Sequence, residues 1–139
     1  MKVLIVGESG SAETLGGALE AEGVEATRPP NSLLSASGDE LGQIAAALVE
    51  LEALLNADRP DAVLLSSHAN LALAAILAAT KLQIPVARLE GKATGEERPA
   101  GVNGRLIDQL ADARVASDPA SVIAWLRAMG SPEPKSAGR

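Results

Sequence analysis

The sequence contains no cysteine, phenylalanine or tyrosine, and only one tryptophan and one histidine. Without cysteine, a disulfide framework and thiolate chemistry are excluded, and a cytoplasmic location is expected. Nucleic-acid binding is not expected, because the chain has almost no rings to stack on bases and a net charge of −6. We expect no membrane span either, since the longest apolar run, residues 71–79, is far below the roughly 20 residues required. The first residues have a strand pattern rather than that of a signal peptide.

The remaining composition is that of an acidic chain built largely from alanine and leucine. Its 139 residues are 47% apolar and 22% charged, which suits one domain with a sizeable core. We expect this domain to span residues 1–130. The tail, residues 131–139, combines two prolines with small polar residues, so we expect it to be disordered. Residues 29–38 and 91–99 are expected to be irregular.

Short runs rich in valine, isoleucine and leucine alternate with longer segments of helical period. The expected strands are residues 2–6, 24–27, 62–65, 85–89 and 114–116, and the expected helices are residues 11–22, 39–57, 70–82, 101–111 and 119–129. Strands that are apolar throughout suit a parallel sheet covered on both faces. The pattern therefore predicts an α/β fold, a doubly wound open parallel sheet of about five strands with helices on both faces.

Two of these helices carry specific sequence signals. Segment 39–57 has an apolar stripe, formed by Leu41, Ile44, Leu48, Leu51 and Leu55, which predicts an amphipathic helix. Segment 119–129 follows Asp118, a favourable N-cap residue, and begins with Pro119 in its first turn.

The segment 70–82 differs from the others because it is apolar around its whole circumference. Leu71, Leu73, Ile76 and Leu77 span the helix, with alanines between them. Such a helix is either enclosed at the centre of the sheet's face or covered by a partner subunit. We expect a homodimer, because large exposed apolar patches are rare in monomers. Central burial is the alternative.

The expected strand order, 2-1-3-4-5, places a ligand crevice at the carboxyl ends of the first and third strands. Gly7, Ser9 and Gly10 lie in the loop after the first strand, where the free N–H groups of the next helix suit an anion. This loop matches no established phosphate-binding motif, and many such loops bind nothing. Ser66 and Ser67 follow the third strand. We expect these five residues to bind a ligand.

His68 and Glu90 are the candidate catalytic residues, since each follows a strand at the carboxyl edge. The alternative for His68 is an exposed or helix-capping histidine. A carboxylate that ends an apolar strand needs a partner, and Arg88 or Lys92 could pair with Glu90. The sequence contains no cluster with the spacing of metal ligands, so we expect no metal and no other cofactor.

Three segments together resemble a known enzyme family. Residues 60–65 (PDAVLL), 73–79 (LAAILAA) and 82–90 (LQIPVARLE), followed by Pro99, Asn103, Arg105 and Asp108, resemble the non-hydrolysing UDP-N-acetylglucosamine 2-epimerases. In that family a PDVVLVHGD-like segment precedes an alanine-rich helix, an IPVxHVEAG-like strand and a PEExNRxxxD-like helix. About 60 to 70 residues match in pattern and spacing, which is more specific than any single motif.

The resemblance implies a Rossmann-like lobe that binds a UDP-sugar or another small anionic ligand. Members of the family have two lobes, as in the two-lobed glycosyltransferases, and this chain resembles the N-terminal lobe alone. Asn103 and Arg105 would then be ligand-binding residues, and Glu90 retains the glutamate of VEAG. The other positions depart from the family pattern: His68 replaces an acidic residue, Ala100 and Gly101 replace two glutamates, and Gly10 and Gly104 replace arginines.

Because epimerisation needs several positioned carboxylates, we expect a half-domain relative that is not catalytic by itself. Two other hypotheses remain open. The chain could be a flavodoxin-like interaction module without a ligand, or an enzyme half completed by a separate C-terminal lobe.

Overall fold

The computed structural model describes residues 1–7, 9–30, 39–67, 69–90 and 101–129. Five strands form one parallel sheet in the order β2-β1-β3-β4-β5, which confirms the predicted topology. The strands are β1 (Lys2–Val6), β2 (Glu25–Thr27), β3 (Ala62–Leu65), β4 (Val86–Glu90) and β5 (Ala113–Ala116). The helices are α1 (Ser9–Ala21), α3 (Glu40–Ala57), α4 (Asn70–Lys81), α5 (Gly101–Leu110) and α6 (Pro119–Met129). The expected irregular segments and tail lie largely or wholly outside the described residues.

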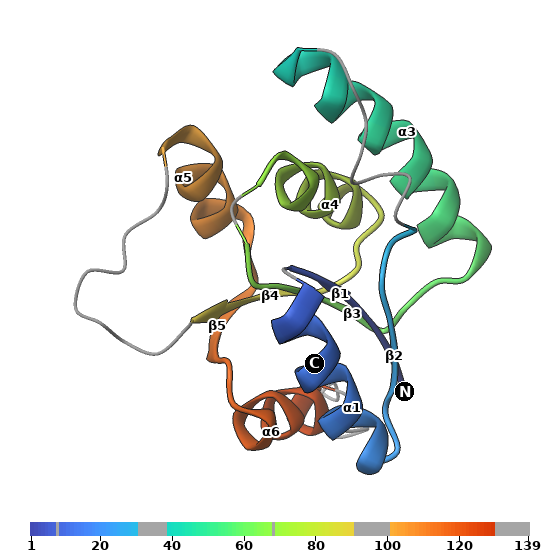
Figure 1. The fold of residues 1–139 in the computed structure, drawn as a ribbon, viewed down its shortest axis with the longest axis vertical. Helices are drawn as coiled ribbons and strands as arrows, with labels where there is room; N and C mark the ends of the chain where they lie inside the picture. Colours follow the sequence, from blue (N-terminus) through green and yellow to red (C-terminus); the bar gives the residue numbers. More distant parts are fainter. Residues whose placement is uncertain (8, 31–38, 68, 91–100, 130–139) are drawn as a thin grey trace, which may run out of the picture.

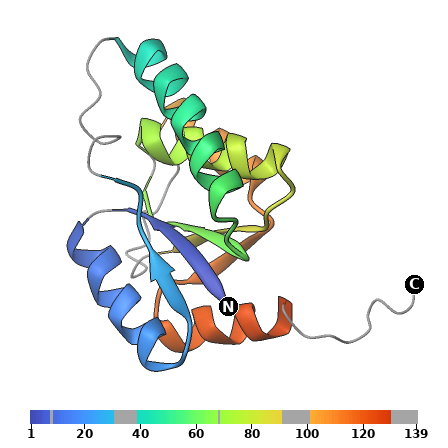
Figure 2. The same ribbon diagram turned by 90° about the vertical axis from the view of Figure 1, so that its right-hand side faces the viewer.

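The helices cover both faces of the sheet and so form three layers (Figures 1 and 2). Helices α1 and α6 pack on one face, against Val3, Ile5 and Leu64. Helices α3, α4 and α5 lie on the other side, where the core includes Leu4 and Val63. Successive side chains of a strand point to opposite faces, so central strands covered on both faces are apolar at every position. The continuous apolar runs in the sequence have this cause.

The helix ends in the structure follow from local hydrogen bonds. Asp39 accepts a hydrogen bond from the Gly42 N–H at 2.7 Å and caps α3. At the end of α1, Gly23 has φ of +87° and the next N–H, of Val24, bonds to the Leu19 carbonyl. Helix α4 ends in the same way, except that the left-handed position is occupied by Gln83, with φ of +63°.

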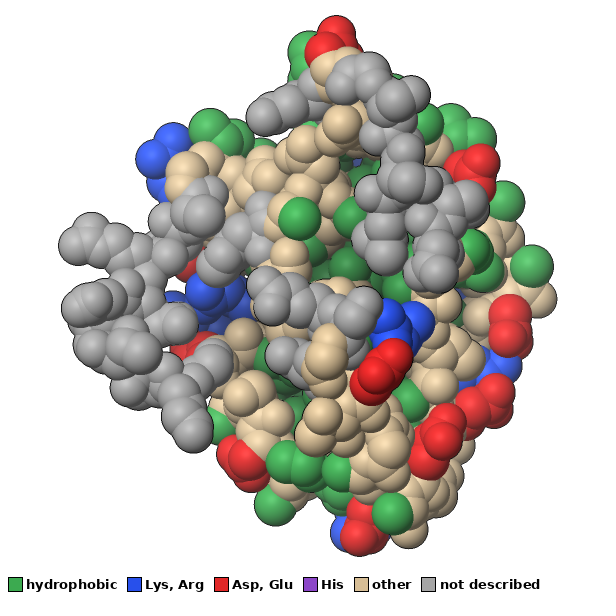
Figure 3. All heavy atoms as spheres, viewed as in Figure 1, with side chains coloured by type: hydrophobic (Ala, Val, Ile, Leu, Met, Phe, Trp, Pro, Cys, Tyr) green, Lys and Arg blue, Asp and Glu red, His purple; other side chains and the backbone are tan. Residues whose placement is uncertain are grey.

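The amino edge of the sheet is held by carboxylates. Asp61 accepts from the Lys2 N–H at 2.8 Å, and Asp112 accepts from the Val86 N–H at 2.8 Å. The Lys2 ammonium pairs with Asp58, and this hydrogen bond raises the pKa of Lys2 above its ordinary value of 10.5. Elsewhere on the surface, acidic side chains are scattered over the lower and right-hand parts of the face in Figure 3. Within the described ranges, no helix has the length and hydrophobicity to cross a bilayer.

Two sequence-based expectations about the helices need correction. Leu41 is 79% exposed, so it is not part of the stripe that packs inward; Ala47, Leu51 and Leu55 form the buried side of α3. Helix α4 is already enclosed within the chain by α3, α5 and the sheet, and Leu73 is only 5% exposed, so its apolar circumference does not require a partner. Central burial, the alternative weighed for this segment, is what the structure shows.

Candidate functional site

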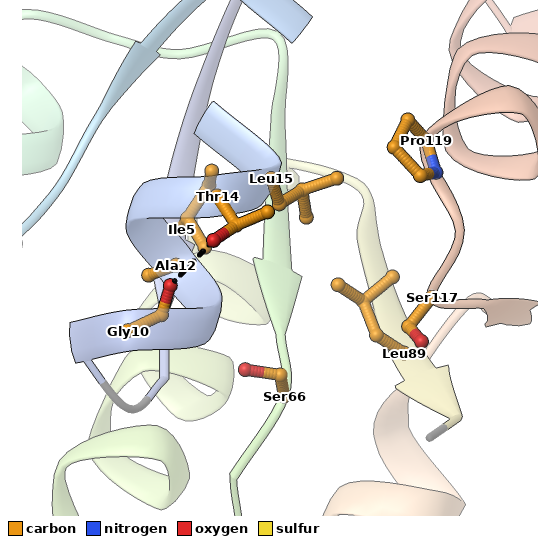
Figure 4. A pocket seen from close by; sticks show the side chains of 9 residues that line it. All are labelled: Ile5, Gly10, Ala12, Thr14, Leu15, Ser66, Leu89, Ser117 and Pro119. Carbon is orange, nitrogen blue, oxygen red and sulfur yellow. Dashed lines mark hydrogen bonds between the residues drawn. The ribbon is translucent and has the colours of Figure 1, made fainter. Parts of the chain in front are cut away.

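A pocket of about 560 Å³ opens at the carboxyl edge of the sheet, on the face covered by α1 and α6 (Figure 4). It is lined by the ends of the strands and by the first turns of both helices, through Ile5, Gly10, Ala12, Thr14, Leu15, Ser66, Leu89, Ser117 and Pro119. None of these lining residues carries a charge. The pocket therefore presents an apolar floor and a few hydroxyl groups, a combination that suits a neutral ring or sugar.

The Ser66 hydroxyl reaches this pocket because Gly7 has no side chain. Ser66 continues β3 beside β1, and its N–H donates to the Val6 carbonyl at 2.9 Å. A β-carbon placed on Gly7 would lie 1.8 Å from the Ser66 hydroxyl oxygen. In Figure 4 that hydroxyl points toward the first turns of α1. Gly7 and Ser66 were predicted separately as ligand-binding residues. The structure shows that the position of the Ser66 hydroxyl depends on the absence of a side chain at Gly7.

The start of α1 supplies the backbone donors on one side of the pocket. The first N–H groups of a helix have no partner within the helix and attract negative charge. Helix α1 begins at Ser9, and Gly10 lies in its first turn with no neighbouring atom near the place of a β-carbon. The Thr14 hydroxyl donates to the Gly10 carbonyl at 3.0 Å. Of the two helix starts at the pocket, α1 is the one that suits an anion.

The other helix start is already occupied by a side chain. Asp118 accepts from the Ser121 N–H at 2.9 Å and from the Ser121 hydroxyl at 2.8 Å. These two bonds lower the pKa of the Asp118 carboxyl below its ordinary value of 3.8. The predicted N-cap is confirmed, and its carboxylate places a negative charge where a ligand phosphate would otherwise sit.

Glu90, a candidate catalytic residue, is held in an ion pair outside this pocket. Its carboxylate lies 3.1 Å from Nε of Arg114, and both side chains are half exposed. The sequence suggested Arg88 or Lys92 as the partner of Glu90. The structure instead pairs Glu90 with Arg114, on the neighbouring strand β5. Arg88 faces Asp108 of α5 instead, at 3.2 Å, and Lys92 lies outside the described residues. Strand alternation directs Glu90 to the side of the sheet that α4 and α5 cover.

Asn103 belongs to a chain of side-chain amides that joins three helix starts. Its Nδ2 donates to Oδ1 of Asn70 at 3.0 Å, and Nδ2 of Asn70 donates to Oε1 of Gln43 at 3.3 Å. These residues stand in the first turns of α5, α4 and α3. The chain therefore orients polar groups on the other side of the sheet from the pocket.

The remaining predicted site residues are placed as follows. The Ser67 hydroxyl accepts from the Ala69 N–H at 2.9 Å and shapes the turn into α4, while Arg105 is exposed on α5. His68 lies outside the described residues. Gly10 and Ser66 thus line the pocket and Gly7 adjoins Ser66, whereas Glu90, Asn103 and Arg105 do not line it. No group of three or more potential metal-ligating side chains occurs among the residues that the structure describes.

Sequence reasoning missed Ser117 and Arg114. Ser117 follows β5 at the same edge as Ser66 follows β3, so the carboxyl-end rule applied to the fifth strand would have found it. Arg114 carried no local signal, because its pairing with Glu90 depends on the register that sets Glu90 beside Ala116.

A comparison with models of protein families finds one family that matches most of the chain. The family model described as UDP-N-acetylglucosamine 2-epimerase matches residues 3–135. A comparison with curated protein sequences finds no match.

Solved structures with the same fold include two epimerases. One is the Methanocaldococcus jannaschii UDP-GlcNAc 2-epimerase in complex with UDP-GlcNAc and UDP, with 22% identity, a TM-score of 0.69, and coverage of 92% of this chain and 43% of that one. Another is the Neisseria meningitidis UDP-GlcNAc 2-epimerase bound to UDP-GlcNAc, with 21% identity, a TM-score of 0.59, and coverage of 84% and 40%. The chain spans less than half the length of these enzymes.

A third structure is similar over nearly its full length. It is named as that of a response regulator from Chloroflexus aurantiacus, with 16% identity and a TM-score of 0.58, and the match covers 92% of this chain and 95% of that one.

Proposed function

Since the chain belongs to the UDP-N-acetylglucosamine 2-epimerase family, we propose that it is a half-domain relative that binds a UDP-sugar at the carboxyl edge and is not catalytic by itself. The observation that carries this proposal is the uncharged pocket between α1 and α6, with the Ser66 and Ser117 hydroxyls at its wall and the α1 start beside it. Two epimerases of the same fold were solved with UDP-GlcNAc.

We propose weak binding, because the pocket lacks a cation among its lining residues. A diphosphate is normally held by arginine, lysine or a metal ion, through charge-assisted hydrogen bonds about twice as strong as neutral ones. Here the α1 backbone is the main favourable partner, and the Asp118 carboxylate beside Ser117 repels negative charge. The sugar part of the ligand therefore fits the hydroxyl-lined wall better than the diphosphate does.

We propose that the chain does not catalyse epimerisation, because the described residues that line the pocket lack the acid and base groups that this reaction needs. Loss and return of a proton at a sugar carbon requires carboxylates or comparable groups in contact with that carbon. Glu90 is bound to Arg114 and does not line the pocket, and Gly101 stands where the family pattern has a glutamate. Detectable conversion of UDP-N-acetylglucosamine to its C2 epimer by the pure chain would overturn this part of the proposal.

Isothermal titration of the chain with UDP-N-acetylglucosamine and with UDP tests the binding. We expect binding that is weakened about fivefold or more by Ser66→Ala, since one hydrogen bond contributes roughly 1 kcal/mol. Thr80→Ala is the matched control, because it removes a hydroxyl on exposed α4 surface away from the pocket. Equal heats for both variants, or no heat with the unaltered chain, would contradict the site.

Two further functions each have an observation in their favour. The match that covers 95% of the Chloroflexus aurantiacus chain indicates that this fold makes up nearly all of that chain, which favours an interaction module that needs no ligand. Coverage of only about 40% of the epimerases favours an enzyme half completed by a separate C-terminal lobe. Ligand titration separates the first from the main proposal, and recovery of a lobe-sized partner by pull-down supports the second.

A further inference from the structure

The start of α6 offers few hydrogen-bond donors to a ligand in the pocket between α1 and α6. Its first residue is Pro119, which has no N–H group. The N–H of Ser121 donates to the Asp118 carboxylate at 2.9 Å, and that of Val122 donates to the Asp118 carbonyl at 3.2 Å. Three of the first four residues of α6 therefore have no backbone donor left for a ligand phosphate.

Asp118 also brings a negative charge to the edge of this pocket. In the chain it stands between Ser117 and Pro119, both of which line the pocket. Its carboxylate accepts from the Ser121 hydroxyl at 2.8 Å in addition to the N–H, and these two bonds hold the charge at the helix start. None of the described residues that line the pocket carries a positive charge to offset it. An anionic group on the α6 side of the pocket therefore meets repulsion.

The polar side chains on the pocket wall are hydroxyls, which carry no charge. The N–H groups of Ser66 and Ser117 donate to carbonyls of the neighbouring strands, at 2.9 and 3.0 Å, so these serines offer a ligand their hydroxyls. A serine hydroxyl both donates and accepts, as do the hydroxyls of a sugar ring or of ribose. Ile5, Leu15 and Leu89 add apolar surface to the same pocket, which suits the face of such a ring.

We propose that this pocket prefers an uncharged hydroxylated ring, a free sugar or a nucleoside, to the phosphorylated form of the same ring, and that Asp118 determines this preference. The inference rests on the ligand site proposed above and names the class of ligand that the site prefers. A fixed charge that repels one class of ligand contributes to specificity without strengthening the binding of the other. A UDP-sugar is then held through its uncharged parts, and its diphosphate lowers the affinity.

Titration of the full chain with matched pairs of ligands, followed by NMR shifts of the pocket amides, tests the preference. One pair is uridine and UDP, the other is N-acetylglucosamine and its 1-phosphate, and UDP-N-acetylglucosamine is titrated beside them. The two pairs distinguish a nucleoside from a sugar as the ring that is bound. For that ring we expect the uncharged member to bind about threefold tighter or more, because a carboxylate at the protein surface repels a phosphate modestly.

Asp118→Asn removes the charge and keeps an N-cap oxygen for α6. It should tighten binding of the phosphorylated ligand about fivefold and leave that of the uncharged ligand within about twofold. This gain should shrink as salt is raised from about 20 to 500 mM, because salt screens exposed charges. Asp39→Asn is the matched control: Asp39 caps α3 through the Gly42 N–H at 2.7 Å, on the other side of the sheet, and its substitution changes the net charge equally.

The possible outcomes separate this inference from the ligand site on which it rests. Tighter binding of the phosphorylated ligand by the unaltered chain, or equal gains in Asp118→Asn and Asp39→Asn, would overturn the preference and leave the ligand site in place. If neither pair nor UDP-N-acetylglucosamine shifts the pocket amides, both the ligand site and the preference are wrong.

Discussion

Gly7 and Ser66 occupy one space: the Ser66 hydroxyl oxygen lies 1.8 Å from where a β-carbon of Gly7 would stand. This approach comes from the parallel pairing of β1 with β3, which sets Val6 beside Leu65 and so brings the next residue of each strand together. The hydroxyl is thereby directed into the pocket at the carboxyl edge (Figure 4). The sequence places Gly7 in a candidate phosphate-binding loop. In the structure, its lack of a side chain makes room for the Ser66 hydroxyl.

Gly7→Ala should therefore displace Ser66 and destabilise the fold. Overpacking of this kind costs about 1–3 kcal/mol, and the displaced hydroxyl should also lower ligand affinity. Urea unfolding gives the first quantity and titration calorimetry the second. Gly17→Ala is the control, because nothing lies near its added methyl group in the middle of α1, and it should stabilise the helix by up to about 1 kcal/mol. Equal effects of the two substitutions would contradict the steric explanation.

Gln83→Gly should stabilise the protein by about 1 kcal/mol. Gln83 has φ of +63° at the end of α4, where a side chain costs roughly 1–2 kcal/mol relative to glycine, partly offset by the greater freedom of glycine in the unfolded chain. The reverse experiment is Gly23→Ala at the end of α1, with φ of +87°, which should destabilise by a similar amount. Opposite signs for the two variants in urea unfolding are the expected result; a destabilising Gln83→Gly would refute it.

Arg88 and Asp108 form a largely buried ion pair that connects strand β4 to helix α5. The Arg88 side chain is 7% exposed. The buried Oδ1 of Asp108 lies within ion-pair distance but accepts no aligned hydrogen bond, so the attraction is mainly coulombic.

Removing one partner of this pair should cost more than removing both. Arg88→Met leaves a largely buried carboxylate without its counter-charge, and we expect a loss of about 3 kcal/mol. Replacing both residues, as in Arg88→Met with Asp108→Leu, should recover part of that loss, because no isolated charge remains. A double-mutant cycle by chemical unfolding measures the coupling, and strictly additive losses would show that the ion pair has no role.

Acid stability should depend in part on Asp118. Its hydrogen bonds from Ser121 lower the pKa of its carboxyl from 3.8. A group whose pKa is lowered by folding stabilises the fold above its unfolded pKa, and this contribution is lost as the pH falls below 3.8 through the folded value. Asp118→Asn keeps an N-cap oxygen without the titration, so the difference in Tm between it and the unaltered chain should shrink from pH 6 to about pH 3. A difference that stays constant would exclude this origin.

The sequence predicted the helix positions well, because they depend on local pattern, and the strand order followed from the arrangement common to doubly wound sheets. Buried strands such as β3 are apolar at every position, and Asp118 marks the start of α6 with its own side chain. The errors concern contacts between elements distant in the chain. Leu41 falls on the same side of the helical period as Leu48, yet it is exposed because α4 covers only part of α3.

Only one general rule predicted the candidate site from the sequence, namely that ligands of such folds bind at the carboxyl ends of the strands. That rule found Gly10 and Ser66, which line one pocket, and Gly7, which adjoins Ser66. It could not separate the two faces of the edge, so it grouped Glu90 with them, although strand register pairs Glu90 with Arg114. A search of the sequence for opposite charges near Glu90 finds Arg88 first, which faces Asp108 instead.

Because α3 is supported mainly by α4, its amide protons report a different event from those of the sheet. The strands open to solvent only when both helical layers come away, whereas α3 detaches once its side facing α4 separates, at a lower free energy. In a monomer we expect α3 amides to exchange with deuterium well before those of β1 and β3. Exchange rates would thus divide the molecule into an outer unit, α3, and an inner unit built on the sheet.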